Sequence, residues 1–188
     1  ETIHARTGGN SRKASGHAAS NLDIYQVNST YYDALGRNDR DYLIARAIQF
    51  FSPGKPQVYY VGLLAGANDM DLVARTDVGR DINRHYFTRE ETHDALRRPV
   101  VKHLMELIRL RNSTPAFDGT FSMPACERDA LVLRWDNDDA YAELNVDLSR
   151  RCATIDIRTA GQTRRSIING DLLYATADQG DSEVERNA

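Results

Sequence analysis

The stretch LIARAIQFFSPGKPQVYYVG, residues 43–62, decides the fold class because it joins two different hydrophobic patterns through a short turn. In its first half the apolar residues recur every three or four positions, which is helical spacing. Pro53 and the glycine after it stop that helix, and QVYYVG (57–62) is aromatic or β-branched at most positions, as buried parallel strands are. The stretch therefore predicts a helix over 41–51, a strand over 57–62 and a protein of the α/β class.

Composition limits the class of protein and its partners. The chain has 188 residues, of which 41% are apolar and 27% charged, and its formal net charge is −3. These values are typical of a soluble globular protein with one sizeable domain or two small ones. Nucleic-acid-binding proteins usually carry a basic excess, so we expect no nucleic-acid partner. No apolar run approaches the roughly 18–20 residues that a membrane span needs, so we expect no membrane partner either.

The cysteines and the first residues bear on compartment and completeness. Cys126 and Cys152 are far apart in sequence and lack metal-ligand spacing, which favours two reduced thiols in a cytosolic protein over a disulfide bridge. Residues 1–21 have no initiator Met, no apolar signal core and no periodicity, and predict a surface loop. A single buried strand also needs sheet partners on both sides. We therefore expect the chain to be a fragment.

The rest of the chain shows three kinds of pattern. Residues 62–98 are dense in polar side chains and predict one long functional loop. Residues 99–112 begin with a proline and repeat apolar residues at helical spacing, which predicts an amphipathic helix. The sequence beyond it alternates in short pieces separated by Asp, Asn and Gly, which predicts a small antiparallel sheet or sandwich. The expected domains are 1–116, an all-β module over 117–175 and a polar tail over 176–188.

The first candidate binding cluster is GRDINRHYF, residues 79–87. It follows the predicted strand 57–62, and α/β barrels gather their binding groups on the loops that follow strands. Arg80 is suited to a polyol, carboxylate or phosphate because a guanidinium offers a planar fork of donors. The alternative is that the charged residues of this cluster pin the long loop by salt bridges. Spacing alone slightly favours the second interpretation.

The second candidate cluster is NLDIYQ, residues 21–26. Asp23, Tyr25 and Gln26 offer a carboxylate, a phenol and an amide, which together are able to read sugar hydroxyls. The alternative is an ordinary strand edge with solvated polar side chains, and the residues themselves favour this alternative.

Catalytic and metal motifs are not evident in the sequence. The five histidines are scattered without metal spacing, and there is no Gly-rich phosphate loop, nucleophile elbow or Cys/His pair. Glycosyl transfer with retention needs two carboxylates about 5–5.5 Å apart, and no pattern identifies such a pair. Residue chemistry alone thus leads only to ligand-binding loops of an α/β barrel fragment.

Four motifs, in order along the chain, carry a resemblance to one family: NLDIYQVNSTYYDALG, ARAIQFFSPGKPQVYYVGLLAGANDM, GRDINRHYF and RPVVKHLMELIRLRN. From about Thr2 to Phe121 the chain resembles the sucrose phosphorylase family of the α-amylase superfamily, glycoside hydrolase family 13. The resemblance implies the C-terminal part of a (β/α)8 barrel, from the loop after strand seven through helix eight, followed by a small all-β C-terminal domain. Helix 41–51 would be the seventh barrel helix, strand 57–62 the eighth strand and helix 99–112 the eighth helix.

The resemblance also implies an activity. The family converts sucrose and phosphate into α-D-glucose 1-phosphate and fructose by double displacement, using an aspartate nucleophile, a glutamate acid–base and a second, stabilising aspartate. By the resemblance all three lie upstream of Glu1, so we expect no catalytic residue in this chain, and no turnover by the 188 residues alone. No cofactor or metal is implied, since inorganic phosphate is the co-substrate. A sugar and phosphate are the expected partners, in a cytoplasmic protein, and the resemblance leaves a homodimer open as its assembly state.

The resemblance assigns binding roles to five residues. Arg80 matches the family's arginine that holds the far hydroxyls of the glucosyl ring. Asp23, Tyr25 and Gln26, with Leu22 beside them, match a mobile acceptor-site loop that exchanges groups between the fructose-bound and phosphate-bound states. A carboxylate there repels phosphate, so its withdrawal on exchange is physically reasonable.

Other functions remain open from the sequence. Relatives that act on sucrose 6-phosphate or glucosylglycerate share the scaffold, as do sucrose and glucan hydrolases of the superfamily. The apolar Ile24 resembles the sucrose-type loop more than one with a cation for a second phosphate. A non-catalytic carbohydrate-binding module over 117–175 is a further alternative, but that part offers few aromatic residues beyond Trp135, Tyr141 and Tyr174.

Overall fold

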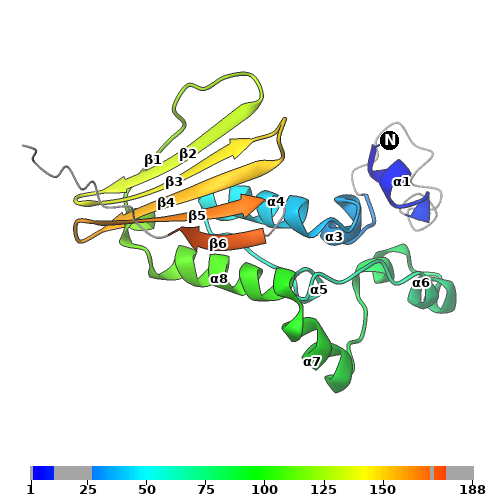
Figure 1. Ribbon diagram of the computed structural model, residues 1–188. Coiled ribbons are helices and arrows are strands. Elements are labelled where there is room, and N and C mark those ends of the chain that lie inside the picture. Colours follow the sequence, from blue (N-terminus) through cyan, green and yellow to red (C-terminus); the bar gives the residue numbers. More distant parts are fainter. Residues whose placement is uncertain (1, 11–26, 170–171, 177–188) are drawn as a thin grey trace, which may run out of the picture.

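An antiparallel sheet packed on two long helices forms the body of the protein (Figure 1). The computed structural model describes residues 2–10, 27–169 and 172–176. The helices in this part are α1 (Thr2–Arg6), α3 (Tyr31–Ala34), α4 (Asp39–Phe51), α5 (Tyr60–Leu63), α6 (Met70–Thr76), the 3-10 helix η2 (Gly79–Asn83), α7 (Arg89–Arg97), α8 (Pro99–Ser113) and the 3-10 helix η3 (Pro115–Asp118).

The last part of the described chain is a six-stranded sheet whose strands pair antiparallel in sequence order. The strands are β1 (Thr120–Ser122), β2 (Ala130–Asn137), β3 (Ala140–Asp147), β4 (Cys152–Thr159), β5 (Gln162–Asn169) and β6 (Leu172–Thr176). Short turns join most neighbours, as the Asp, Asn and Gly punctuation indicates. The predicted antiparallel sheet is confirmed. Both cysteines are free thiols in this structure.

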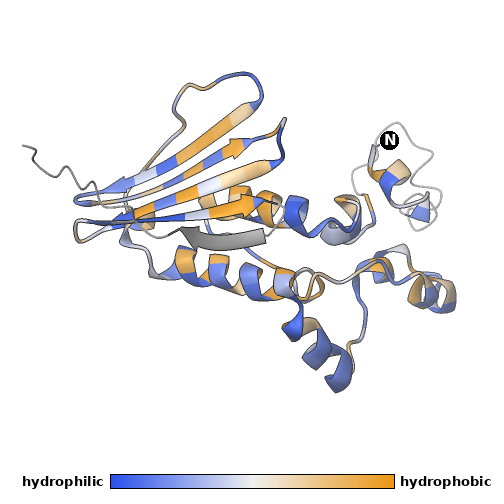
Figure 2. Ribbon diagram, in the orientation of Figure 1, coloured by the Kyte–Doolittle hydropathy of each residue, from blue (hydrophilic) through white to orange (hydrophobic). Residues whose placement is uncertain are grey.

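One face of the sheet is apolar and covers α4 and α8. The cross-strand register aligns Leu133 with Leu144, and Leu144 with Ile155, and all three side chains are buried. Side chains alternate between the two faces of a strand, so this alignment produces a continuous apolar layer. In Figure 2 the apolar colouring runs along these strands and along α4 and α8, whereas α7 is almost wholly hydrophilic.

The opposite face of the sheet carries a row of charges. Arg134 lies across from Glu143, Glu143 from Asp156, and Asp156 from Arg165. Arg134 Nη1 donates to Glu143 at 3.0 Å, and Arg165 Nε donates to Asp156 Oδ1 at 2.6 Å. Opposite charges directly across a sheet are stabilising. This face therefore has an internal explanation that needs no ligand.

The two long helices confirm the predictions over 41–51 and 99–112. Helix α4 begins after Asn38, whose side chain accepts from the Asp41 N–H, and α8 has Pro99 in its first turn. The helices contribute buried apolar residues to the same core as the sheet. Trp135 Nε1 on β2 also donates to the Phe51 carbonyl at the end of α4, at 2.7 Å.

The strand predicted over 57–62 is wrong. Residues 57–59 are not in a strand, and Tyr60–Leu63 is the short helix α5, with Tyr59 in an extended conformation at its N-cap (φ −68°, ψ 148°). A parallel strand is held by ladder hydrogen bonds to its neighbours, and no described segment pairs with this one. The apolar composition of a buried parallel strand is thus present without the ladder that defines one. The predicted barrel stays a prediction.

The polar segment 62–98 was predicted to be a single loop. That prediction is wrong, because α6, η2 and α7 lie within the segment. Asp69 caps α6 by accepting from the Leu72 N–H at 2.7 Å. Thr88 and Glu91 form a capping box at the start of α7. These capping signals are local, and the polar character of the segment obscured them.

One smaller prediction at the N-terminal end also needs correction. The loop predicted over 1–21 contains α1, after which the Thr7 N–H donates to the Ile3 carbonyl at 3.0 Å. Further along the chain, α3 begins at Tyr31 because the Thr30 side chain caps it. The predicted domain boundary at residue 116 stays a prediction. One apolar core joins residues from both sides of that position.

Candidate functional site

A hollow of about 340 Å³ lies between the segment that precedes α3 and the 3-10 helix η2. Its lining combines aromatic, apolar and polar groups, as ligand sites commonly do. The lining residues are Val27, Asn28, Ser29, Tyr59, Arg80, Ile82, Asn83 and Arg84. This set contains the one predicted binding residue that lies in the described part of the chain, Arg80.

Arg80 is held in place by its backbone rather than by its side chain. The neighbouring Ile82 is fully buried, and its carbonyl accepts from the Asp69 N–H at 2.9 Å, which fixes η2 against the start of α6. The Arg80 side chain is exposed, and among the described residues no hydrogen bond or ion pair engages its guanidinium. An exposed cation on a rigid turn, beside a hollow, is well placed to hold a polyol or an anion.

The other charged residues of the 79–87 cluster have internal partners. Arg84 Nη1 lies 3.4 Å from Asp81 Oδ1. His85 Nδ1 lies 2.6 Å from Asp69 Oδ2, and His85 Nε2 lies 3.4 Å from Glu91 Oε1. The interpretation of the cluster as loop-pinning salt bridges is therefore confirmed for these residues. The cluster divides into a pinned part and the guanidinium of Arg80.

The His85 contacts also shift two pKa values. The hydrogen bond with Asp69 raises the pKa of His85, and the bond with Glu91 adds to this effect. Burial by itself raises the pKa of Asp69, but the hydrogen bonds from His85 and from the Leu72 N–H outweigh it, so the pKa of Asp69 is lowered. Opposite charges favour each other's ionised form. His85 and Asp69 thus form an ion pair that joins the start of α6 to the residues after η2.

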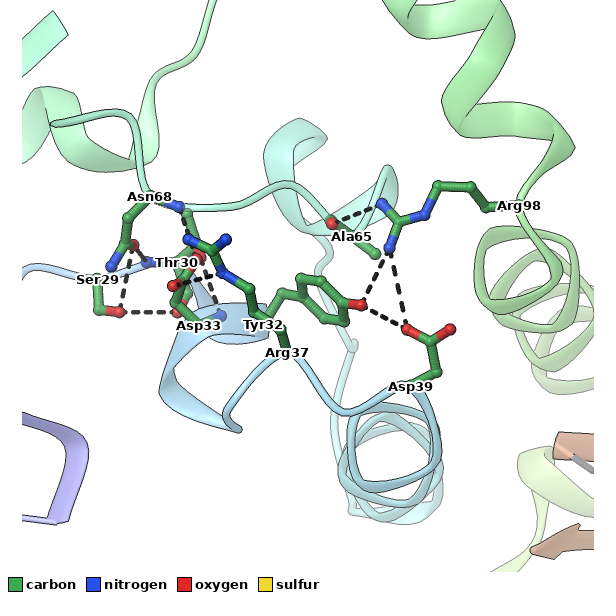
Figure 3. Close-up of polar contacts among 9 residues, drawn as sticks. All are labelled: Ser29, Thr30, Tyr32, Asp33, Arg37, Asp39, Ala65, Asn68 and Arg98. Carbon is green, nitrogen blue, oxygen red and sulfur yellow. Dashed lines mark hydrogen bonds and ion pairs between the residues drawn. The ribbon is translucent and has the colours of Figure 1, made fainter. Parts of the chain in front are cut away.

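The second wall of the hollow is fixed by a side chain from a distant part of the sequence (Figure 3). Asn68 Oδ1 accepts from the Thr30 N–H at 2.6 Å and from Ser29 Oγ at 3.3 Å. Close by, Arg98 donates to the Ala65 carbonyl at 3.0 Å and to the Tyr32 hydroxyl at 3.1 Å. Side chains, rather than a sheet ladder, therefore join the segment around α3 to the segment after α5.

Four predicted site residues, Leu22, Asp23, Tyr25 and Gln26, lie outside the described residues, so their arrangement stays a prediction. The described wall begins at Val27, the next residue along the chain. The segment predicted to bind the acceptor therefore leads directly into the hollow that contains Arg80.

The predicted position of the catalytic carboxylates, upstream of Glu1, also stays a prediction. Glu1 marks the boundary of that prediction and was not itself expected to act as an acid, a base or a nucleophile. It lies outside the described residues, so the structure gives it no place in the candidate site.

A larger hollow of about 710 Å³ lies on the other side of this junction, between Tyr32, Asn68, His85 and Arg98. Its cations are already paired. Arg37 Nε donates to Asp33 at 2.9 Å, and Arg98 donates to the Tyr32 hydroxyl and to a backbone carbonyl. Its size alone does not make it the better candidate, because Arg37, His85 and Arg98 in its lining already have partners within the fold.

Sequence reasoning missed two residues of the site. Tyr59 lines the hollow and is 52% exposed, with its ring centroid 4.6 Å from that of Tyr60. The strand prediction treated this tyrosine as buried. Asn68 carried no signal in the sequence, since its role depends on the return of the chain to Thr30, 38 positions away.

The described residues include no group of three or more His, Cys, Asp or Glu side chains able to hold a metal ion. No described helix is long and apolar enough to cross a membrane. The lining of the candidate site, as far as the structure describes it, contains cations and amides but no carboxylate. This arrangement suits holding a polyol or an anion rather than breaking a glycosidic bond.

Comparisons with known proteins show what the chain as a whole is similar to. No protein-family model matches the sequence. The chain is 60% identical over 155 residues to a sucrose phosphorylase from Agrobacterium vitis, and the match covers 82% of this chain and 32% of that protein. It is 55% identical to a sucrose phosphorylase from Bifidobacterium adolescentis over 79% of this chain and 30% of the relative. The chain thus spans about a third of the length of these relatives.

A solved structure is similar as well. The crystal structure of sucrose 6F-phosphate phosphorylase from Thermoanaerobacter thermosaccharolyticum matches with a TM-score of 0.73 and 47% sequence identity. The match covers 74% of this chain and 29% of the solved chain. Sequence and fold therefore point to the same group of relatives.

Proposed function

Because this chain belongs to the family of sucrose phosphorylases and related glycosyl phosphorylases, we propose that it forms the ligand-holding part of a retaining glucosyl phosphorylase. In the proposed reaction the bond between glucosyl C1 and the fructose oxygen breaks. A bond between C1 and a phosphate oxygen forms, which gives α-D-glucose 1-phosphate and fructose. The observation that carries the proposal is the Arg80 guanidinium in the hollow beside Val27–Ser29, which has no partner among the residues that the structure describes.

Within this proposal, this chain binds the substrates, and the rest of the full-length protein supplies the residues that react with them. Arg80 donates to the glucosyl hydroxyls, and the segment with Leu22, Asp23, Tyr25 and Gln26 receives fructose or phosphate at the acceptor side. The nucleophile, the acid–base and the stabilising aspartate come from the part of the family's sequence that this chain does not match. The 188 residues alone should therefore not release fructose from sucrose.

The test compares two arginines of one cluster in the full-length protein that contains this chain. Arg80→Ala should lower kcat/KM for the phosphate-dependent release of fructose from sucrose by about 100-fold, because it removes charged hydrogen bonds to the sugar. Arg84→Lys should change it by less than about threefold, since a lysine retains the charge opposite Asp81 and surface ion pairs contribute little.

Similar losses from both substitutions would contradict the division of the cluster into a binding residue and pinning residues. Both variants should keep the wild-type melting temperature within a few degrees, because both side chains are exposed. A large drop in melting temperature for Arg80→Ala alone would instead assign that arginine to the fold.

A second candidate function is a phosphorylase for a related glucoside. Sucrose 6(F)-phosphate phosphorylase from Thermoanaerobacterium thermosaccharolyticum is 49% identical, and glucosylglycerol phosphorylase from Marinobacter adhaerens is 47% identical. Their similarity to this chain is not far below that of the sucrose phosphorylases. Phosphorolysis rates of the full-length protein on sucrose, sucrose 6-phosphate, glucosylglycerol and glucosylglycerate separate these candidates. Reaction without phosphate would favour a hydrolase instead.

The proposal extends to fold, cofactor and assembly. The full protein is a (β/α)8 barrel of the α-amylase superfamily, and this chain supplies its last helices and the β-rich domain. It uses inorganic phosphate as co-substrate and no cofactor. Its compartment is the cytoplasm, since the two free thiols fit a reducing environment. Its assembly state is a homodimer, without a nucleic-acid or membrane partner.

A further inference from the structure

Two consecutive residues, Asn68 and Asp69, connect the two walls of the candidate site. The Asn68 side chain binds the wall that precedes α3, through the Thr30 N–H at 2.6 Å and Ser29 Oγ at 3.3 Å. Asp69 binds the other wall: its N–H donates to the Ile82 carbonyl at 2.9 Å, and its carboxylate lies 2.6 Å from His85 Nδ1. One peptide unit therefore links both sides of the hollow.

The buried carboxylate of Asp33 holds the backbone of Asn68 in this link (Figure 3). Asp33 is 4% exposed and accepts from the Asn68 N–H at 2.7 Å, from Thr30 Oγ1 at 3.2 Å and from Arg37 Nε at 2.9 Å. Thr30 thus contacts both Asp33 and Asn68. The closed set of hydrogen bonds orients the Asn68 side chain as well as its backbone, and leaves little freedom for the segment before α3.

The Asn68 side chain carries an unfavourable contribution to stability, and its bridging role explains why an asparagine stands at this position. Its Nδ2 is buried and has no hydrogen-bond partner among the described residues. An unpaired buried donor reduces stability, so the position is not optimised for packing. Its Oδ1, in contrast, accepts two hydrogen bonds from the wall of the site.

We propose that Asn68 is a positioning residue: it holds Val27–Ser29 at a fixed separation from η2 and so sets the width of the hollow between Val27–Ser29 and Arg80. As far as it concerns catalysis, this inference rests on the proposed phosphorylase function. The bridge itself does not depend on that function. Asn68 does not line the hollow with Arg80, and it acts through the backbone of Thr30.

The experiment compares Asn68→Ala with Asn112→Ala in the full-length protein that contains this chain. Asn112 is exposed on α8 and does not line the candidate site, so it gives a matched loss of one amide. In Asn68→Ala the Thr30 amide should exchange with deuterium at least about tenfold faster, because its hydrogen bond is lost. The KM for phosphate should rise about tenfold with kcat within about threefold, since the residue positions a binding segment. Asn112→Ala should change neither quantity.

The outcomes separate this inference from the function on which it partly rests. Unchanged Thr30 exchange in Asn68→Ala overturns the bridge, whatever the activity. Faster exchange with an unchanged KM overturns the positioning role. If the wild-type protein converts none of the candidate glucosides, the proposed function fails, and the exchange rate of Thr30 alone decides the bridge. If Asn68→Ala does not fold, Asn68→Gln keeps the amide, displaces the acceptor oxygen by one methylene and should give the same two changes.

Discussion

The sheet and the segment from Ser52 to Arg98 are held by different kinds of interaction. In the sheet, backbone ladders join six consecutive strands, and one apolar face lies on α4 and α8. In the other segment the helices are short, and the connections between distant parts are polar side chains such as Asn68 and Arg98. Of its buried apolar residues, Leu64, Ala65 and Ala95 belong to the main core, whereas Val61, Leu72 and Ile82 lie outside it.

This difference separates stability from binding. Apolar burial is non-directional and favours a single stable fold, whereas side-chain hydrogen bonds fix particular groups at particular distances. The candidate site lies between Arg80 of this segment and the wall before α3, and the Asn68 side chain fixes that wall by such bonds. We therefore expect core substitutions in the sheet to change global stability, and substitutions in the polar segment to change ligand binding.

The largest expected effect on stability is that of Ile155→Ala. Ile155 is fully buried between the sheet and the helices, and its loss leaves a cavity that the paired strands are not free to close. The free energy of unfolding should fall by about 3 kcal/mol. Urea denaturation followed by circular dichroism measures this change.

The matched substitution in the other region is Ile82→Ala, since Ile82 is also fully buried. It should reduce global stability by a smaller amount, because Ile82 is outside the main core, yet raise the KM for sucrose by moving η2. Equal losses of global stability from the two substitutions, with no change in KM, would remove the contrast between the regions.

The sheet could be predicted from sequence because its signals are local. Alternating segments such as ALVLRWDN and the turns between them specify strands without reference to distant residues. Helices α4 and α8 are equally local, through their periodicity and their first turns. The prediction over 57–62 was wrong for the opposite reason: a parallel strand is defined by neighbours far away in the sequence, and composition cannot show whether they are present.

The next expected effect is that of Trp135→Phe, which tests how firmly the sheet is joined to α4. The phenylalanine retains most of the apolar contact but removes the donor to the Phe51 carbonyl, a buried acceptor at the helix end. The free energy of unfolding should fall by about 1–2 kcal/mol. Thermal denaturation followed by circular dichroism measures it.

Tyr141→Phe is the control for this change, since it also alters one polar atom of an aromatic side chain on the sheet. No described hydrogen bond involves the Tyr141 hydroxyl, so the effect should stay within about 0.5 kcal/mol. If both substitutions have the same small effect, the Trp135 hydrogen bond does not contribute to joining the sheet to α4.

The candidate site was predictable only in part. Arg80 could be singled out because charged residues are crowded around it, and the resemblance separated it from its neighbours. The structure gives the physical basis of that separation, since Arg84 and His85 have internal carboxylate partners. Tyr59 and Asn68 could not be found, because their positions depend on how segments distant in sequence return to one another.

The smallest expected effect is a pH dependence of the polar segment through His85. The pKa of His85 is raised above its ordinary value of 6.5, chiefly by the hydrogen bond with Asp69, so the protonated form is favoured in the folded state. This contribution is complete below pH 6.5 and is lost as the pH rises through the folded pKa. The pKa of Asp69 is lowered from 3.8, so its contribution is lost only in acid. The ion pair therefore stabilises the segment most between these two limits, by less than about 1 kcal/mol because the imidazole is partly exposed.

Replacing His85 by Gln isolates this contribution, because glutamine retains a donor to Asp69 but does not titrate. As the pH rises from below the ordinary His pKa through the raised pKa of folded His85, the wild-type protein should lose stability relative to His85→Gln. His93→Gln, the same change at an exposed position of α7, should follow the wild type throughout. Amide exchange at Asp69 gives a local reading, since its N–H is bound to Ile82 in the wall that carries Arg80. If the protection factor there, which is the exchange rate relative to the intrinsic rate at each pH, does not change with pH, the His85–Asp69 pair does not hold that wall, and the backbone bond to Ile82 alone fixes the separation of the two sides of the site.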